Sequence, residues 1–212
     1  MAHLDMPPAD MLHPDMAHAE EKTLRELRAY RPINEQEERD KYEMLWLLSH
    51  EDCWSRENSR MHVTASAWVC DEAAEHVLMC WHNIYRSWSW LGGHADGERD
   101  LLAVAMREVR EESGLVHVQP AQTEPISLEI LSVDGHMKHG HYVSTHVHLN
   151  VTYLLLADPG ERLVVRRDEN SALAWFSPAE AVQKSSEPWL RDHIYQKEND
   201  AMFAWARAHA KN

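Results

Sequence analysis

The spacing of hydrophobic residues changes from helical to strand-like near residue 60. Before that point, EEKTLRELRAY and INEQEERDKYEMLWLLSHE carry apolar residues three and four positions apart, which predicts two helices within residues 19–52. Asn34, with Glu37 three residues later, is a typical N-cap for the second helix. The apolar stripe of that helix should consist of Tyr42, Leu45 and Leu48.

From Met61 onward, short runs rich in β-branched and aromatic residues alternate with turn residues, as in strands. One longer run has helical spacing, with Asp100 as N-cap and Gly114 as C-terminal stop, and Ser177 with Pro178 is typical of a later helix start. The predicted elements are strands at 62–70, 76–81, 87–91, 125–133, 142–156, 162–166 and 172–176, and helices at 100–113, from 178, and at 187–210. This order predicts an α/β (α+β) fold in which helices cover both faces of a mixed β-sheet.

These elements divide the chain into a mobile tail at 1–18, a helical extension at 19–58 and a globular domain at 59–212. Two short helices bury little surface by themselves. We therefore expect the extension to pack on the domain or on a second subunit of a homodimer.

The composition is that of a folded globular protein, with 44% hydrophobic and 26% charged residues among 212. No apolar run approaches about eighteen residues, and the N-terminus lacks the basic and apolar regions of a secretory signal, so we expect a cytoplasmic protein. The three cysteines show no CxxC spacing, which argues against a disulfide framework. A net charge of −14 argues against nucleic-acid or membrane partners, and a small anionic substrate would need local cations.

Residues 106–115, MREVREESGL, place Glu108, Glu111 and Glu112 in one predicted helix. Spacings of three and four residues bring the like charges onto one face, where each pair costs roughly 0.2–0.5 kcal/mol. The acidic face adjoins the apolar side of the helix, at about 120° from it. That apolar side consists of Leu102, Ala105, Met106 and Val109. Two interpretations stay open: a solvated face with salt bridges from Arg107 and Arg110, or the wall of a cleft.

The paired glycines before this helix add a second clue, because glycines between a strand and a helix allow a ligand to approach closely. The whole stretch GGHADGERDLLAVAMREVREESGL resembles the signature of Nudix hydrolases. The positions that fit the signature are Gly93, Arg107, Glu108, Val109, Glu111, Glu112, Gly114 and Leu115. Two positions depart from it: Arg99 stands where the signature has its first glutamate, and Leu91 where many members have proline.

The resemblance implies the Nudix α/β/α sandwich and a pyrophosphohydrolase that cleaves a nucleoside diphosphate derivative by water attack on phosphorus. It implies Mg²⁺ or Mn²⁺ as cofactor, with the metal ligands Glu108, Glu111 and Glu112. Glu111 and Glu112 are also the expected catalytic residues, and Arg107 should hold the loop through an ion pair to Glu98 or Asp100. The physical chemistry is compatible, since Mg²⁺ prefers carboxylate, phosphate and water oxygens and would neutralise the substrate.

Other expected site residues depend less on the signature. Many family members use a late acidic residue as ligand or base, and Glu169 is the candidate here, with a solvated loop carboxylate as the alternative. Gly93 is expected to approach the substrate, and His94 either donates to a phosphate oxygen or only folds the loop. In YVSTHVHLNVTYL, alternation places His146 and His148 on one strand face, which is either a substrate-binding wall or a solvent-facing surface.

The signature leaves the identity of the diphosphate substrate open, so the expected partner is a small anionic nucleotide-type molecule. Two other functions stay open: an isopentenyl diphosphate isomerase-like enzyme, which keeps the diphosphate intact, and a non-catalytic nucleotide-sensing module. Trp88 and Trp90, on the strand before the glycines, either stack on a base or pack in the core.

Overall fold

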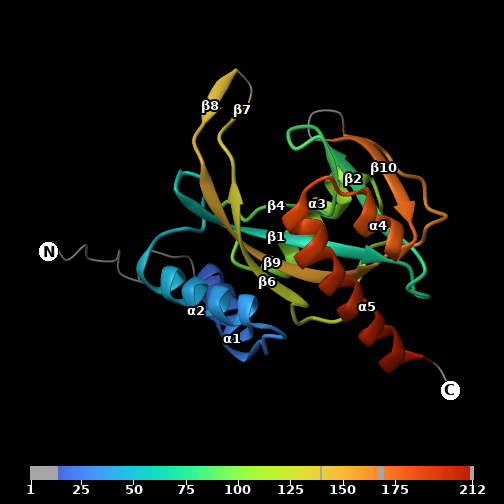
Figure 1. Ribbon diagram of the computed structural model, residues 1–212. Coiled ribbons are helices and arrows are strands. Elements are labelled where there is room, and N and C mark those ends of the chain that lie inside the picture. The colour runs from blue at the N-terminus through green and yellow to red at the C-terminus, as the bar shows by residue number, and fades with distance from the viewer. Residues whose placement is uncertain (1–13, 139, 167–169, 211–212) are drawn as a thin grey trace, which may run out of the picture. The chain divides into compact units, whose positions relative to one another are not determined.

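The computed structural model describes residues 14–138, 140–166 and 170–210 (Figure 1). The chain forms two compact units, each built from segments that are distant in the sequence. The first unit comprises residues 1–64, 94–101 and 128–150, and the second comprises residues 65–93, 102–127 and 151–212. Four strands, β1, β4, β6 and β9, contribute residues to both units. The domain boundaries expected from the sequence stay a prediction.

The strands are β1 (Met61–Cys70), β2 (Val77–His82), β3 (Ser87–Ser89), β4 (Leu91–His94), β5 (Gln119–Pro120), β6 (Ser127–Val133), β7 (His136–Lys138), β8 (His141–Val143), β9 (His146–Leu156) and β10 (Asn170–Phe176). The helices are α1 (Pro14–Ala29), α2 (Glu35–His50), α3 (Leu101–Ser113), α4 (Pro178–Lys184), the π-helical turn η2 (Leu190–Tyr195) and α5 (Gln196–His209). The strand expected at residues 162–166 is wrong, because these residues have no regular secondary structure.

One sheet runs in the order β10-β2-β1-β9-β5, with β3 on β2, β4 on β1 and β6 on β9. The expected hairpin of the first two strands is confirmed, since β1 and β2 pair antiparallel with Val69 opposite Leu78. Strand β10 pairs antiparallel with the other edge of β2, with Trp175 opposite Leu78. The short hairpin β7–β8 was not predicted and forms a separate two-stranded sheet.

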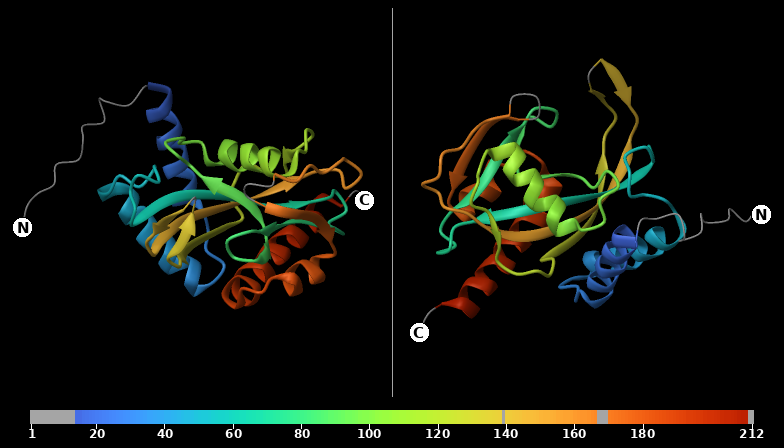
Figure 2. Two further views of the ribbon diagram at one scale, coloured as in Figure 1. Left: turned by 90° about the horizontal axis from the view of Figure 1, so that it is seen from above. Right: turned by 180° about the vertical axis from the view of Figure 1, so that it is seen from behind.

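In the second unit, α3 lies on one face of the sheet, and α4, η2 and α5 lie on the other (Figure 2). The expected α/β/α arrangement is therefore confirmed. A buried cluster that includes Trp68 and Tyr195 fills the space on the side of α5. Trp88 and Trp90 pack against this cluster, which supports core packing for them. The ring of Trp88 meets Phe176 edge-on, with 4.9 Å between the ring centroids.

The ends of two helices in this unit follow the local sequence signals. Helix α3 ends at Ser113, and Gly114 takes a φ of +74°, as expected for a glycine that terminates a helix. A Cβ atom on Gly114 would lie 2.7 Å from Cβ of Val164, so a side chain has no room there. At the start of α4, the Ser177 side chain and Glu180 form a capping box.

In the first unit, α2 begins as expected: the Asn34 side chain accepts a hydrogen bond from the Glu37 amide at 2.9 Å. The expected apolar stripe is wrong in part, because Tyr42 is 72% exposed. The residues of α2 that are buried are Glu37, Met44, Leu47 and Leu48. The face of α2 that carries Glu37 is buried, because the Glu37 carboxylate accepts hydrogen bonds from the Tyr30 hydroxyl and from the Ile33 amide.

Both N-terminal helices contact other segments of the first unit. Thr23 Oγ1 of α1 donates to the Arg99 carbonyl at 2.6 Å, and Asp40 of α2 accepts from the Ile130 amide at 3.0 Å. The helical extension therefore docks on residues that lie far along the chain, as expected. Helix α1 begins at Pro14, inside the stretch for which the sequence predicted a tail. None of the helices in the described ranges is long and apolar enough to cross a membrane.

Candidate functional site

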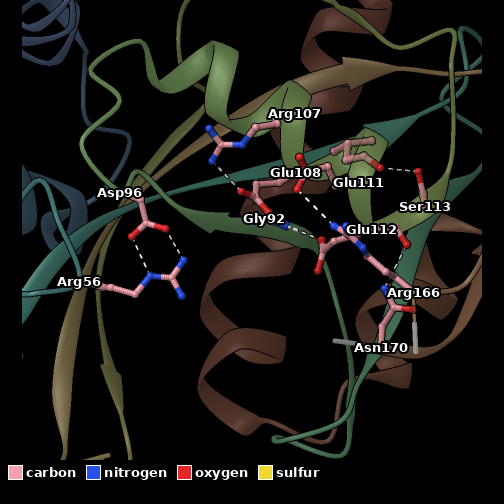
Figure 3. Close-up of polar contacts among 11 residues, drawn as sticks. Arg56, Gly92, Asp96, Arg107, Glu108, Glu111, Glu112, Ser113, Arg166 and Asn170 are labelled. Carbon is pink, nitrogen blue, oxygen red and sulfur yellow. Dashed lines mark hydrogen bonds and ion pairs between the residues drawn. The ribbon is translucent and has the colours of Figure 1, made fainter. Parts of the chain in front are cut away.

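Two of the three signature glutamates, Glu108 and Glu112, lie against the paired glycines of β4, and Figure 3 shows them beside Gly92. The Gly92 amide donates a hydrogen bond to Oε2 of Glu112 at 3.0 Å. A Cβ atom on Gly93 would lie 2.5 Å from Cδ and Oε2 of Glu108, so only glycine leaves room for that carboxylate. The carboxylates of Glu108 and Glu112 therefore lie against adjacent residues of one strand. The sequence predicted that a ligand would approach these glycines closely, and in the structure the side chains of the protein itself do so.

Two arginines supply positive charge beside these carboxylates. Arg107 Nη2 lies 2.7 Å from Oε1 of Glu108, and Arg166 Nη1 lies 3.3 Å from Oε2 of Glu111 (Figure 3). The Arg166–Glu111 side chains are about half exposed, 46% and 47%, so their pairing adds little stability. They are therefore available to a charged ligand.

Glu112 is the most firmly held of the three glutamates. The residue is 5% exposed, and Asn170 Nδ2 donates to its backbone carbonyl at 3.1 Å. Asn170 is itself fully buried at the start of β10. Neither Asn170 nor Arg166 was singled out from the sequence, because their roles depend on the approach of the segment around β10 to α3, which no local pattern shows.

The residues on α3 fit a hard divalent cation. Carboxylate oxygens are the donors that Mg²⁺ and Mn²⁺ prefer. The room left at Gly93 holds one such carboxylate, that of Glu108, beside the strand, and the Gly92 amide orients another, that of Glu112. The roles expected for Glu108, Glu111 and Glu112 as metal ligands stay predictions that this arrangement supports.

In the first unit, residues 95–100 form a tightly held loop between β4 and α3. Asp96, in the left-handed region with a φ of +48°, makes a bidentate pair with Arg56. This pairing, which outweighs partial burial, lowers the pKa of Asp96. Glu98 Oε1 accepts from the amides of Arg99 and Asp100 at 2.7 and 3.0 Å, so its carboxylate fixes the last turn of the loop.

Arg99, which departs from the signature, is a packing residue of the first unit. Its side chain is only 9% exposed, its guanidinium lies 4.6 Å from the Trp54 ring centroid, and Nε lies 3.5 Å from Glu20 of α1. Burial lowers the pKa of Arg99. Neighbouring Asp100 accepts from Lys22 of α1 at 3.1 Å. The expected ion pair of Arg107 with Glu98 or Asp100 stays a prediction.

The histidines expected on β9 lie in the first unit and do not face solvent. His146 is 7% exposed, and its ring centroid lies 5.1 Å from that of His148. His94 lies 5.2 Å from His148 and 4.9 Å from His62, centroid to centroid. The solvent-facing alternative for this strand face is therefore wrong, and the substrate-binding alternative for His94, His146 and His148 stays a prediction.

Burial lowers the pKa of three of the histidines, His62, His94 and His148. It lowers the pKa of His94 to about 3, with a further contribution from the positive charge of Arg56. It lowers the pKa of His148 to about 2, with His94 next in effect. The pKa of His62 is also lowered by burial. His62 was missed from the sequence, although the alternation of His62, Thr64 and Ser66 along β1 marks a polar strand face that the structure buries.

The remaining expected residue, Glu169, lies outside the described residues. Its proposed role as ligand or base therefore stays a prediction. Its neighbour Asn170, which contacts Glu112, shows that β10 begins close to the C-terminal turn of α3.

Residues 60–197 match the profile of the NUDIX domain. Similar solved structures include a NUDIX-family hydrolase from Clostridium perfringens, at 18% identity over 66% of this chain and 97% of that chain, with a TM-score of 0.46. Another is the dihydroneopterin triphosphate pyrophosphohydrolase of E. coli, at 19% identity over 63% and 92%, with a TM-score of 0.47. A third is an Ap4A hydrolase of C. elegans, at 14% identity over 67% and 97%, with a TM-score of 0.45. No curated protein matches the chain.

Proposed function

The chain belongs to the Nudix family, and on that premise we propose that it hydrolyses a diphosphate bond in a nucleoside diphosphate derivative, using Mg²⁺ or Mn²⁺. The observation that carries the proposal is the seating of Glu108 and Glu112 on Gly93 and Gly92 of β4. It turns two carboxylates of α3 toward one short stretch of strand. The enzyme class is the one expected from the sequence, a Nudix-type pyrophosphohydrolase.

Each glutamate has a distinct part in this proposal. Glu108 and Glu112 would hold the cation, and half-exposed Glu111 would serve as a further ligand or orient the attacking water. When bound, the cation supplies positive charge to the diphosphate and acidity to water. Arg166, which is half exposed, can turn from Glu111 to a phosphate oxygen and so supply the local cation that an acidic protein needs.

Two hydrogen-bond partners limit the motion of Glu112. The Gly92 amide and the Asn170 side chain fix its carboxylate and its backbone carbonyl separately. A glutamate whose carboxylate and backbone are both held loses little conformational entropy on binding a cation, which favours binding.

A panel of nucleotide sugars, dinucleotides and oxidised nucleotides, with phosphate release as readout, tests the proposal. We expect turnover of at least one class, dependent on Mg²⁺ or Mn²⁺. Because changes next to a metal ligand already cost 10–100-fold, Glu112→Gln should lower kcat/KM by at least about 100-fold. The matched control is Glu124→Gln, which makes the same change at an exposed position of the second unit and should have no effect.

The two alternative functions give different results in the same experiment. An isomerase would convert isopentenyl diphosphate without releasing phosphate. A sensing module would bind a nucleotide without turnover at any metal concentration. Either result, together with no hydrolysis across the panel, would overturn the proposal.

A further inference from the structure

A group of histidines in the first unit includes none of the glutamates of α3 and has the arrangement of metal ligands. One ring nitrogen from each of His62, His94 and His148 lies within 4.8 Å of the others. These residues come from β1, the end of β4 and β9. Three segments of the described chain thus each contribute one nitrogen donor. The metal site expected from the sequence consists of carboxylates alone, so it does not account for these histidines.

One hydrogen bond fixes which nitrogen of His62 carries the lone pair. Nδ1 of His62 faces the Asn58 carbonyl at 3.0 Å, so it carries the proton and Nε2 carries the lone pair. Within the described part of the chain, Nε2 of His62 is buried and has no hydrogen-bond partner. A buried acceptor without a partner is unfavourable, and a bound cation would supply that partner.

The fourth ring, His146, repeats this pattern. Its Nδ1 faces the Ser144 carbonyl at 2.8 Å, and its Nε2 lies 3.2 Å from Nε2 of His148. Metal-binding histidines typically donate their second N–H to a backbone carbonyl, which fixes the tautomer and the ring orientation. His62 and His146 both have such a carbonyl, which simple packing of aromatic rings does not require.

We propose that His62, His94 and His148 bind a divalent transition-metal ion, with Zn²⁺ as the ion that the donor set favours. Neutral imidazole nitrogens suit zinc and its neighbours in the first row, whereas Mg²⁺ prefers oxygen. Zinc bonds imidazole at about 2.0–2.1 Å, so nitrogens on one tetrahedral ion lie about 3.3 Å apart. The three rings need to close from distances of up to 4.8 Å, which small side-chain rotations allow. Three protein ligands leave a fourth position for water or another ligand.

The proposed zinc site uses none of the glutamates of α3, and titration of the full-length protein with Zn²⁺ alone tests it. After removal of metals by chelation, calorimetry should show one tightly bound zinc ion per chain, distinct from weaker binding of zinc to the carboxylates of α3. We expect His94→Ala and His148→Ala each to weaken this binding by at least about 100-fold. His141→Ala, at an exposed position of β8, should leave it unchanged, and so should Glu112→Gln, which separates this proposal from the proposed hydrolysis.

A second measurement uses wild-type protein and so does not depend on the folding of the variants. X-ray absorption of the protein with one equivalent of zinc should show at least three imidazole nitrogens at about 2.0 Å. Cobalt in place of zinc should give the intense visible bands of a tetrahedral site. The proposal is overturned if wild-type protein binds no zinc, if the histidine variants bind it as tightly as wild type, or if the absorption spectrum shows mainly oxygen ligands.

Discussion

Replacement of Gly93 by alanine should disable metal binding while leaving the fold intact. The new Cβ atom would lie 2.5 Å from the Glu108 carboxylate, whereas ordinary contacts begin at 3.4 Å. The carboxylate must therefore retreat by close to 1 Å. Because the atom that must move is the end of a flexible side chain, we expect a loss of stability under about 1 kcal/mol. A misplacement of about 1 Å at a reacting centre can cost 10²-fold, and we expect a fall of that size in kcat/KM.

Two other glycine variants make this test specific. In Gly92→Ala, the new Cβ atom would meet the Ala65 carbonyl at 2.6 Å and Cα of Ser66 at 2.7 Å. Backbone cannot move aside as a side chain can, so this variant should lose about 1–3 kcal/mol of stability. In Gly160→Ala, the nearest atom is the Asp158 carboxylate at 3.1 Å, far from the glutamates in sequence, and activity should be unchanged.

The assays are urea unfolding, Mn²⁺ binding followed by electron paramagnetic resonance, and turnover of the best substrate in the panel. Binding of Mn²⁺ without substrate separates an effect on Glu108 from a steric clash with the substrate at Gly93. If Gly93→Ala folds, binds Mn²⁺ as wild type does and keeps kcat/KM within about threefold, the placement of Glu108 in the metal site is refuted.

Three further predictions concern stability. Burial raises the pKa of the Glu187 carboxyl group to about 7. The folded protein therefore holds the proton of this carboxyl group more tightly than the unfolded chain does. Stability should fall as pH rises from 4.5 through about 7. Glu187→Gln should therefore raise Tm at pH 8 and not at pH 4, by about 2–4 °C for each kcal/mol recovered, and an equal shift at both values would contradict this cause. Arg99→Glu, which restores the signature residue, should lower the free energy of unfolding in urea by about 2–4 kcal/mol. The change places a buried carboxylate near Glu20 and removes the cation over the Trp54 ring. Unchanged stability would refute the packing role of Arg99. Deletion of residues 1–52 should lower Tm, because it removes the contact of Thr23 with the loop before α3 and the contact of Asp40 with β6. A truncated chain with unchanged mass in solution, stability and kinetics would show the helices to be dispensable.

Local signals in the sequence predicted much of the fold correctly. Asn34, Gly114 and Ser177 each act through hydrogen bonds or backbone angles within a few residues, so the helix ends that they mark are visible in the sequence. The signature glutamates share this property, since spacing alone places them on one face of α3. The family and the α/β/α arrangement followed from that stretch and from the order of strands and helices around it.

The errors have a common physical cause, which is tertiary contact. The buried face of α2 is set by Glu37, whose carboxylate binds Tyr30, and hydrophobicity alone pointed to Tyr42 instead. Residues 162–166 have the composition of a strand but no regular secondary structure.

The histidine group could not be predicted for the same reason. His62, His94 and His148 are separated by tens of residues, so no local spacing connects them. They meet only because β1, β4 and β9 belong to one sheet, which the sequence does not show.

The most direct test of the proposed hydrolysis is mass spectrometry of the products formed in water labelled with heavy oxygen. With Mg²⁺ and the best substrate of the panel, we expect one labelled oxygen per turnover in a phosphoryl group of one product, and almost no product from Glu112→Gln. Substrate turnover without label on phosphorus, or labelled product at the wild-type rate from Glu112→Gln, would contradict water attack at a site built on Glu108 and Glu112.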